Sequence, residues 1–185
     1  MPEQTITHIV VKNEQAREHG TFFVVEGCER HSNGDIRYWA QLTCNTVFGI
    51  VGTFFGSMGS PAAQFLSHCN KDYIIGRLWG LQSDVYDGGV AKKNLTKWVL
   101  QERRRIEITN EEARELLMDI DLADFETEFG FQSLVYGHRH FYQAFSEGGG
   151  SDYKVPNPQA EGFWEHLWPG FLAELAERAE AAAHG

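Results

Sequence analysis

The segment that decides the fold is the C-terminal stretch Phe163-Trp164-Glu165-His166-Leu167-Trp168-Pro169-Gly170-Phe171-Leu172-Ala173-Glu174-Leu175. Its aromatic and aliphatic residues recur at intervals of three and four positions, which places them on one broad stripe of a helix. Pro169 lies inside this pattern and has no amide hydrogen, so either the helix kinks there or a new helix begins with Pro169 in its first turn. Such a stripe faces a hydrophobic core, and the rest of the chain must cover it.

The two tryptophans of this stripe, Trp164 and Trp168, admit two interpretations. The first places both side chains in the core. The second makes one of them an exposed anchor for a protein partner, because aromatic side chains carry much of the binding energy at interfaces.

Residues 1–60 have the composition of β-strands and can supply the covering surface. Segments rich in Val, Ile, Thr and aromatic residues alternate with polar or glycine-containing turns, which predicts an antiparallel meander. The Asn33-Gly34 pair predicts a tight hairpin between the second and third strands. Four glycines recur in and after the last segment and predict a twisted edge, a bulge or a close backbone approach. The predicted strands span residues 5–11, 21–29, 36–43 and 48–55.

From Pro61 onward the pattern is helical. Ser60 is the expected N-cap of a first helix, which continues through Cys69 and ends near Gly80. The glycine-rich loop 56–61 before it is either a structural turn or an anion site, although it lacks the Gly-Lys-Ser/Thr ending of a P-loop.

Three further helices are expected before the C-terminal one. One follows the loop at Gly88-Gly89 and is capped by Asn94. The next begins with the capping box 109–112, and the last spans the aromatic segment 131–145, weakened by Gly137. Residues 148–158 form a connection to the C-terminal helix, which could not fold alone. We therefore predict one α+β domain over residues 1–185, β-rich over 1–60 and helical over 61–185, with a meander of about four strands against about five helices.

Composition excludes several classes of protein. The chain has 185 residues, 42% of them hydrophobic, and no apolar run long enough to cross a bilayer, which is typical of a soluble globular protein. Its three cysteines, an odd number at wide spacing, indicate reduced thiols and a cytoplasmic location. The net charge of −10 argues against binding of duplex nucleic acid. The basic run 103–105 is either a solvated helix end or a phosphate site.

The segment 107–128 is strongly acidic, with nine carboxylates and one cation, Arg114. Glu111, Glu115 and Asp119 follow one another at four-residue spacing on the side of the helix opposite its apolar face. One interpretation is an ordinary solvated face. The other is a surface that imitates phosphate charge and binds the basic groove of a partner.

Gly137-His138-Arg139-His140 is the strongest candidate for metal binding or acid–base chemistry. If the segment is extended, His138 and His140 point to the same side and could share a metal. If it is helical, the two side chains diverge by about 200° and cannot do so. No motif for a cofactor occurs in the chain, so none is expected.

Several segments resemble small accessory proteins encoded by tailed bacteriophages and prophages: Phe48-Gly49, Phe55-Gly56-Ser57-Met58-Gly59-Ser60-Pro61, Phe65-Leu66, Asp72-Tyr73, Pro156-Asn157-Pro158 and the start of the C-terminal stretch, 163–169. The resemblance rests on structural residue types and carries over no catalytic residue. It implies a context, because small acidic phage proteins of this kind bind and inhibit host machinery, as anti-CRISPR and other anti-defence proteins do.

We therefore expect a non-enzymatic inhibitor that binds a host nucleic-acid-handling or defence complex, CRISPR–Cas-like, in the cytoplasm of a bacterial host. The alternatives are a small metal-dependent hydrolase that uses His138 and His140, or a phage structural or assembly protein. The expected partner-binding residues are the carboxylates of the acidic segment and the two tryptophans: Glu111, Glu112, Glu115, Asp119, Asp121, Asp124, Trp164 and Trp168.

Overall fold

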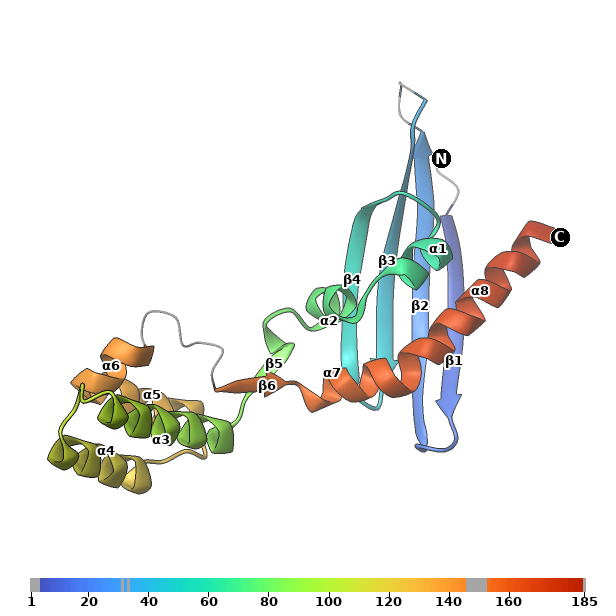
Figure 1. Ribbon diagram of the computed structural model, residues 1–185. Helices are drawn as coiled ribbons and strands as arrows, with labels where there is room; N and C mark the ends of the chain where they lie inside the picture. The colour runs from blue at the N-terminus through green and yellow to red at the C-terminus, as the bar shows by residue number, and fades with distance from the viewer. Residues whose placement is uncertain (1–3, 31, 33, 146–152, 185) are drawn as a thin grey trace. The chain divides into compact units, whose positions relative to one another are not determined.

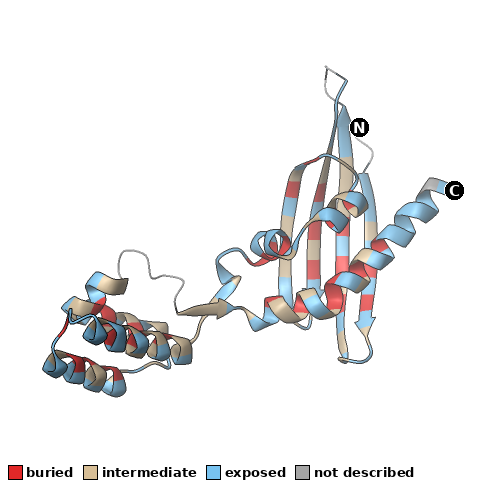
Figure 2. Cartoon of the chain, viewed as in Figure 1, coloured by how far each residue is buried: buried red, intermediate tan, exposed pale blue. Residues whose placement is uncertain are grey.

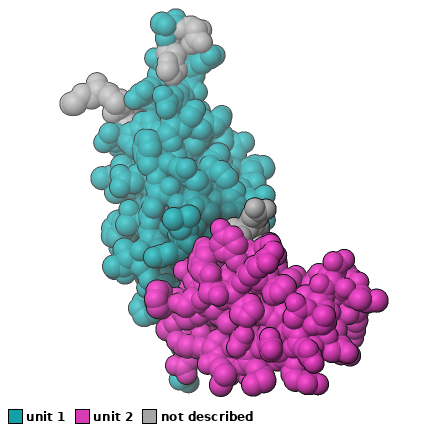
Figure 3. All heavy atoms as spheres, turned by 90° about the vertical axis from the view of Figure 1, so that its left-hand side faces the viewer, with its two compact units in different colours: residues 1–83, 157–185 teal, residues 84–156 magenta. Residues whose placement is uncertain are grey.

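The computed structural model describes residues 4–30, 32, 34–145 and 153–184 (Figure 1). Asn33 of the predicted hairpin turn and residues 148–152 of the predicted connection lie outside these ranges. The chain divides into two compact units: residues 1–83 with 157–185, and residues 84–156 (Figure 3). We call them the sheet unit and the helical unit.

The sheet unit begins with an antiparallel meander of four strands in the order β1-β2-β3-β4. This confirms the predicted topology, and each predicted strand lies largely within an observed one. The edge strand β4 carries the irregularity that its glycines predict, because the register shifts where Tyr38 and Ala40 face it. Gly49 opens β4 with a φ of 126°, a conformation that favours glycine. The strands are β1 Gln4–Asn13, β2 Glu18–Arg30, β3 Ile36–Thr46 and β4 Gly49–Met58.

Helices cover one face of this sheet (Figure 1). Inward residues of the strands, including Ile9, Phe22 and Leu42, form one core with the helices, and the rings of Phe22 and Phe171 stack at 4.5 Å. Burying such rings supplies much of the stability of a domain of this size. The elements are α1 Ala62–His68, α2 Lys71–Trp79, the 3-10 turn η1 Gly80–Gln82, α7 Pro158–Gly162, the π-helical turn η3 Phe163–Leu167 and α8 Trp168–His184.

The C-terminal stretch forms η3 and the start of α8. Pro169 lies in the first turn of α8, which is the second of the two alternatives that the sequence allows. The amide of Trp168 donates to the carbonyl of Phe163, five residues earlier. Because Pro169 has no amide hydrogen and its ring crowds the carbonyl of Glu165, a wider turn at this point relieves the crowding.

The start of the helical region differs from the prediction in two places. Ser60 is not the cap of α1, because that helix begins at Ala62, whose amide donates to a carboxylate oxygen of Glu26 on β2 at 2.9 Å. The single predicted helix is two, since the side chain of Asn70 caps α2. Its predicted end is confirmed: α2 ends at Trp79, followed by Gly80 at a φ of +55°.

The helical unit has its own core. The short strands β5 and β6 pair antiparallel, and the helices bury aliphatic and aromatic side chains such as Leu95, Ile120, Phe131 and Phe141. The elements are β5 Asp84–Tyr86, α3 Gly88–Arg104, α4 Asn110–Leu122, α5 Glu128–Gly137, α6 Arg139–Phe145 and β6 Lys154–Pro156.

Local capping again decides where these helices begin. The cap of α3 is Asp87, whose side chain accepts from the amide of Val90 at 2.9 Å, so Asn94 lies within the helix and the predicted loop at Gly88-Gly89 forms its first turn. The capping box of Thr109 and Glu112 is confirmed. The aromatic segment forms two helices, because His138 adopts an extended backbone between α5 and α6.

The predicted α+β class is confirmed. Among the described residues the structure has more helices than the five expected, because two predicted helices are each divided and the short helix α7 precedes the C-terminal stretch. Whether the two units fold together, as the prediction of one domain requires, stays a prediction. Within the described residues, no helix is both long enough and apolar enough to traverse a lipid bilayer.

Candidate functional site

Glu111 and Glu115 are exposed on α4, whose opposite side buries Ala113, Leu116 and Ile120. Among the described residues, neither carboxylate has an ion-pair or hydrogen-bond partner. The two residues are four positions apart, so they lie about 6 Å apart along the helix axis. They therefore form a pair of solvent-exposed carboxylates on one side of α4.

The other predicted acidic residues have partners inside the helical unit. Glu112 closes the capping box, where hydrogen bonds from the backbone and hydroxyl of Thr109 lower the pKa of its carboxyl group. Asp119 lies 3.1 Å from Nε2 of His138 and Asp121 lies 2.9 Å from Nζ of Lys92. Asp124 accepts from the amide of Glu126 at 2.8 Å, just before α5. These four carboxylates therefore stabilise the local structure.

Cations gather on the neighbouring helix α3. Arg103, in the basic run, donates from Nε to the side chain of Asn110 at 2.7 Å, and Arg105 pairs with Glu102 at 3.1 Å. Both contacts join the end of α3 to groups beside it, which favours the helix-end interpretation of the run over a phosphate site. A hollow of about 300 Å³ opens between α3 and α4, lined by Leu100, Arg103, Asn110, Ala113, Arg114 and Leu117.

His138 and His140 do come together. Their ring centroids are 6.2 Å apart, and His138 Nε2 faces Asp119. The segment follows neither alternative in full, because His138 has an extended backbone whereas His140 lies in the first turn of α6. Nδ1 of His138 is buried and has no hydrogen-bond partner among the described groups. Within the described ranges, however, no three His, Cys, Asp or Glu side chains are placed to hold one metal ion.

The cysteines lie in different environments. Cys44 is in the core of the sheet unit, where burial raises the pKa of its thiol far above neutrality. Burial also raises the pKa of Cys69, whose Sγ lies 3.3 Å from the carbonyl oxygen of Phe65. Cys28 is exposed near the end of β2. The first two thiols are therefore protonated at neutral pH, which is unfavourable for a nucleophile.

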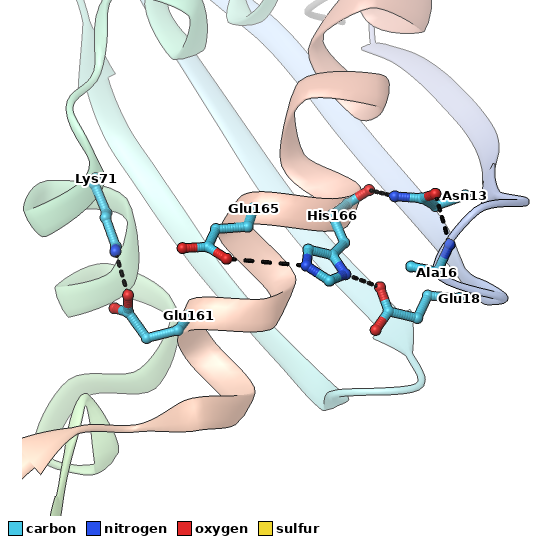
Figure 4. Close-up of polar contacts among 7 residues, drawn as sticks. All are labelled: Asn13, Ala16, Glu18, Lys71, Glu161, Glu165 and His166. Atoms are coloured by element: carbon cyan, nitrogen blue, oxygen red, sulfur yellow. Dashed lines mark hydrogen bonds and ion pairs between the residues drawn. The ribbon is translucent and has the colours of Figure 1, made fainter.

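A polar cluster at η3 holds the C-terminal segment on the sheet unit (Figure 4). Nδ1 of His166 pairs with Glu18 of β2, and the carbonyl of His166 accepts from the side chain of Asn13 at 3.2 Å. Glu161 of α7 pairs with Lys71 of α2 at 2.5 Å. Sequence reasoning missed this cluster because its members are far apart in the chain, so no spacing could predict their approach.

The two tryptophans occupy different positions. Trp168 is 1% exposed and lies in the core, so its side chain cannot reach a partner in the folded protein. Trp164 is partly exposed and stacks on Trp168 at 5.7 Å. Its position agrees with the first interpretation, in which both side chains support the core.

The open face of the sheet, opposite the helices, carries exposed apolar side chains that sequence reasoning missed. Trp39 and Phe54 lie beside each other on it, with ring centroids 6.0 Å apart. They line a hollow of about 230 Å³ together with Glu29, Arg37 and Gly56. The signal was present in the strands, where apolar residues occupy inward and outward positions alike instead of alternating with polar ones.

One comparison with known proteins gives a match. A family model described as a phage family matches residues 3–177, which takes in nearly all of both units. No curated protein and no solved structure matches the chain.

Proposed function

The chain belongs to a phage protein family, and from that premise we propose that it is a non-enzymatic inhibitor that acts in the cytoplasm of a bacterial host. It binds a host complex that handles nucleic acid, a CRISPR–Cas-like defence complex being the leading candidate. The contact is made partly through the acidic surface of α4.

The observation that carries this proposal is the pair Glu111 and Glu115, exposed and without partners among the described residues. A protein that binds nucleic acid presents clustered Lys and Arg side chains to phosphate. Two fixed carboxylates on a rigid helix can occupy such a groove in place of phosphate, and long-range attraction speeds their association. Asp119 and Asp121 follow the pair on the same helix and add to the field, although each already has a cationic or histidine partner.

The test is capture of host proteins by the tagged chain, compared between wild type and Glu111→Lys/Glu115→Lys. The matched control is Glu174→Lys/Glu177→Lys, which makes the same change of charge at exposed positions of α8. We expect wild type and control to retain the same host protein at about 0.15 M salt and the α4 variant to lose it. For wild type and control, binding of the host protein should weaken at about 0.5 M salt, because exposed charges are screened there.

Two results would oppose the proposal. One is a bound host protein that both double variants retain equally, since the acidic surface would then make no contact. The other is a captured protein that short oligonucleotides fail to displace, because a mimic of phosphate charge must compete with nucleic acid for the same groove.

The alternative of a metal-dependent hydrolase draws on one observation, the approach of His138 and His140 beside Asp119. It requires stoichiometric metal in the purified protein and a hydrolytic activity that His140→Ala removes. Elemental analysis decides between the two functions at little cost, because the inhibitor needs no metal.

A further inference from the structure

The open face of the sheet exposes large apolar side chains on β1, β2 and β4. Buried and exposed residues alternate along the strands (Figure 2), and five of the exposed residues at outward positions are large and hydrophobic. Soluble proteins seldom leave so much apolar surface uncovered unless it is an interface. These residues and their exposed fractions are Ile6 71%, Val10 48%, Phe23 41%, Ile50 75% and Phe54 54%.

The register of the strands arranges the outward residues in rows across the sheet. One central row is Ile6-Val25-Gln41-Phe54, and the next is His8-Phe23-Thr43-Gly52. The row beyond the second is Val10-Thr21-Asn45-Ile50. A fourth row lies on the other side of the first row. In it Gln4 pairs with Gly27, and Gly27 pairs with Trp39, which borders the hollow at Gly56.

The outward positions of β4 alternate between a large hydrophobic residue and a glycine: Ile50, Gly52, Phe54 and Gly56. This alternation is self-complementary. If a second β4 runs over the first in the opposite direction, centred between Gly52 and Phe54, each large residue of one strand faces a glycine of the other. A face that fits its own copy in this way is the requirement for an isologous dimer.

We propose that a second copy of this chain packs on the open face, about a two-fold axis that crosses the four strands between the two central rows. Phe54 then faces the partner's Gly52, and Phe23 faces the partner's Val25. Ile50 faces the partner's Gly56 and enters the hollow of about 230 Å³ that Trp39 and Phe54 line. The same contacts occur twice, once in each direction.

The charges on the face agree with this arrangement. The chain carries a net charge of −10, yet among the described outward positions of β1–β4 the one carboxylate is Glu29. The two-fold axis places the end of one sheet that bears Glu29 over the end of the other sheet that bears the partner's Lys12. Two copies therefore meet without the repulsion that their overall charge would cause elsewhere on the surface.

The area suits a dimer of moderate affinity. Four strands about 4.8 Å apart, with about nine residues each rising about 3.4 Å, cover roughly 600 Å² before the relief of the side chains is counted. A standard interface buries about 800 Å² on each partner. Facing sheets pack about 10 Å apart with their strands nearly aligned, so we expect a dissociation constant on the order of micromolar.

The experiment is sedimentation equilibrium of the full chain over a range of concentrations, at low and high salt. We expect wild type to dimerise and Ile50→Asp to raise the dissociation constant about tenfold or more. Leu81→Asp is the matched control, because Leu81 is exposed in the same unit but lies in η1, off the sheet. Circular dichroism checks folding, and Ile6→Asp replaces Ile50→Asp if that variant unfolds.

Two outcomes overturn the proposal: a wild type that stays monomeric up to about 100 μM, or a dimer that survives both Ile50→Asp and Ile6→Asp. A dimer that dissociates at high salt also opposes it, since apolar contacts are not screened. The inference stands apart from the proposed host partner, which uses α4 of the helical unit, so Glu111→Lys/Glu115→Lys should leave the dimer intact.

Discussion

At Gly88 the backbone of α3 passes directly against the carbonyl oxygen of Phe125, and a β-carbon built on Gly88 would collide with that oxygen. The neighbouring Gly89 has more room, because the nearest atom to its added β-carbon is a side-chain oxygen of Asp87 at 3.2 Å. The two residues are adjacent in the sequence and in the same helical turn. They differ in what the tertiary structure places beside them.

We expect Gly88→Ala to destabilise the helical unit by about 1–3 kcal/mol, because the methyl group forces the backbone of α3 away from Phe125. Gly89→Ala should change the free energy of unfolding by less than about 1 kcal/mol, since alanine is the better helix former. Urea unfolding followed by far-ultraviolet circular dichroism measures both. Equal effects of the two substitutions would show that Gly88 is not in close contact.

At the scale of the element, α4 owes its start to a reciprocal pair of hydrogen bonds between Thr109 and Glu112. The bonds that the side chain of Glu112 accepts from the amide and hydroxyl of Thr109 favour its carboxylate form, which is why they lower its pKa from the ordinary value of 4.5. In the unfolded chain the bonds are absent. Their contribution to stability is therefore complete above pH 4.5 and is lost as the pH falls through the lower pKa of the folded state.

Replacing Glu112 by Gln should therefore make the free energy of unfolding depend less on pH in the acidic range. We expect the free energy of unfolding of Glu112→Gln to fall less than that of wild type between about pH 6 and about pH 3, because the other carboxylates titrate alike in both proteins. Urea titrations at stepped pH measure the difference. Parallel curves would mean that the capping box does not depend on the charge of Glu112.

At the scale of the whole molecule, the chain builds two hydrophobic cores. The core of the sheet unit depends on segments from both ends of the chain, since Phe171 of α8 stacks on Phe22 of β2. The helical unit is one continuous segment between them. A substitution that destabilises the core of the sheet unit therefore tests whether the helical unit depends on that core.

Phe171→Ala removes a fully buried ring, and we expect it to cost the sheet unit about 3–5 kcal/mol. Hydrogen exchange should show lower amide protection in β1–β4 while α3–α5 keep theirs, because each unit has its own core. A matched loss of protection in both units would instead establish one cooperative domain, as predicted from the sequence.

Some helix boundaries were predicted wrongly, because more than one nearby residue can serve as the N-cap. Asn94 and Asp87 are both good N-cap residues; Asp87 caps α3, and the first turn that it opens places Gly88 against Phe125. Asn70 interrupts a helical pattern that periodicity alone would continue. Both outcomes depend on contacts with residues that are distant in the chain or on the direction that the next helix must take.

The sequence by itself determined the β-meander, the capping box at Thr109 and the apolar stripe that ends the chain, because periodicity and capping are satisfied within a few residues. The tertiary structure decided the rest. Among the residues that the structure describes, it paired Asp119 and Asp121 and gave no such partner to Glu111 and Glu115, and it placed helices on one face of the sheet and none on the other. Which charge is neutralised and which surface stays open depends on segments that meet only when the chain folds.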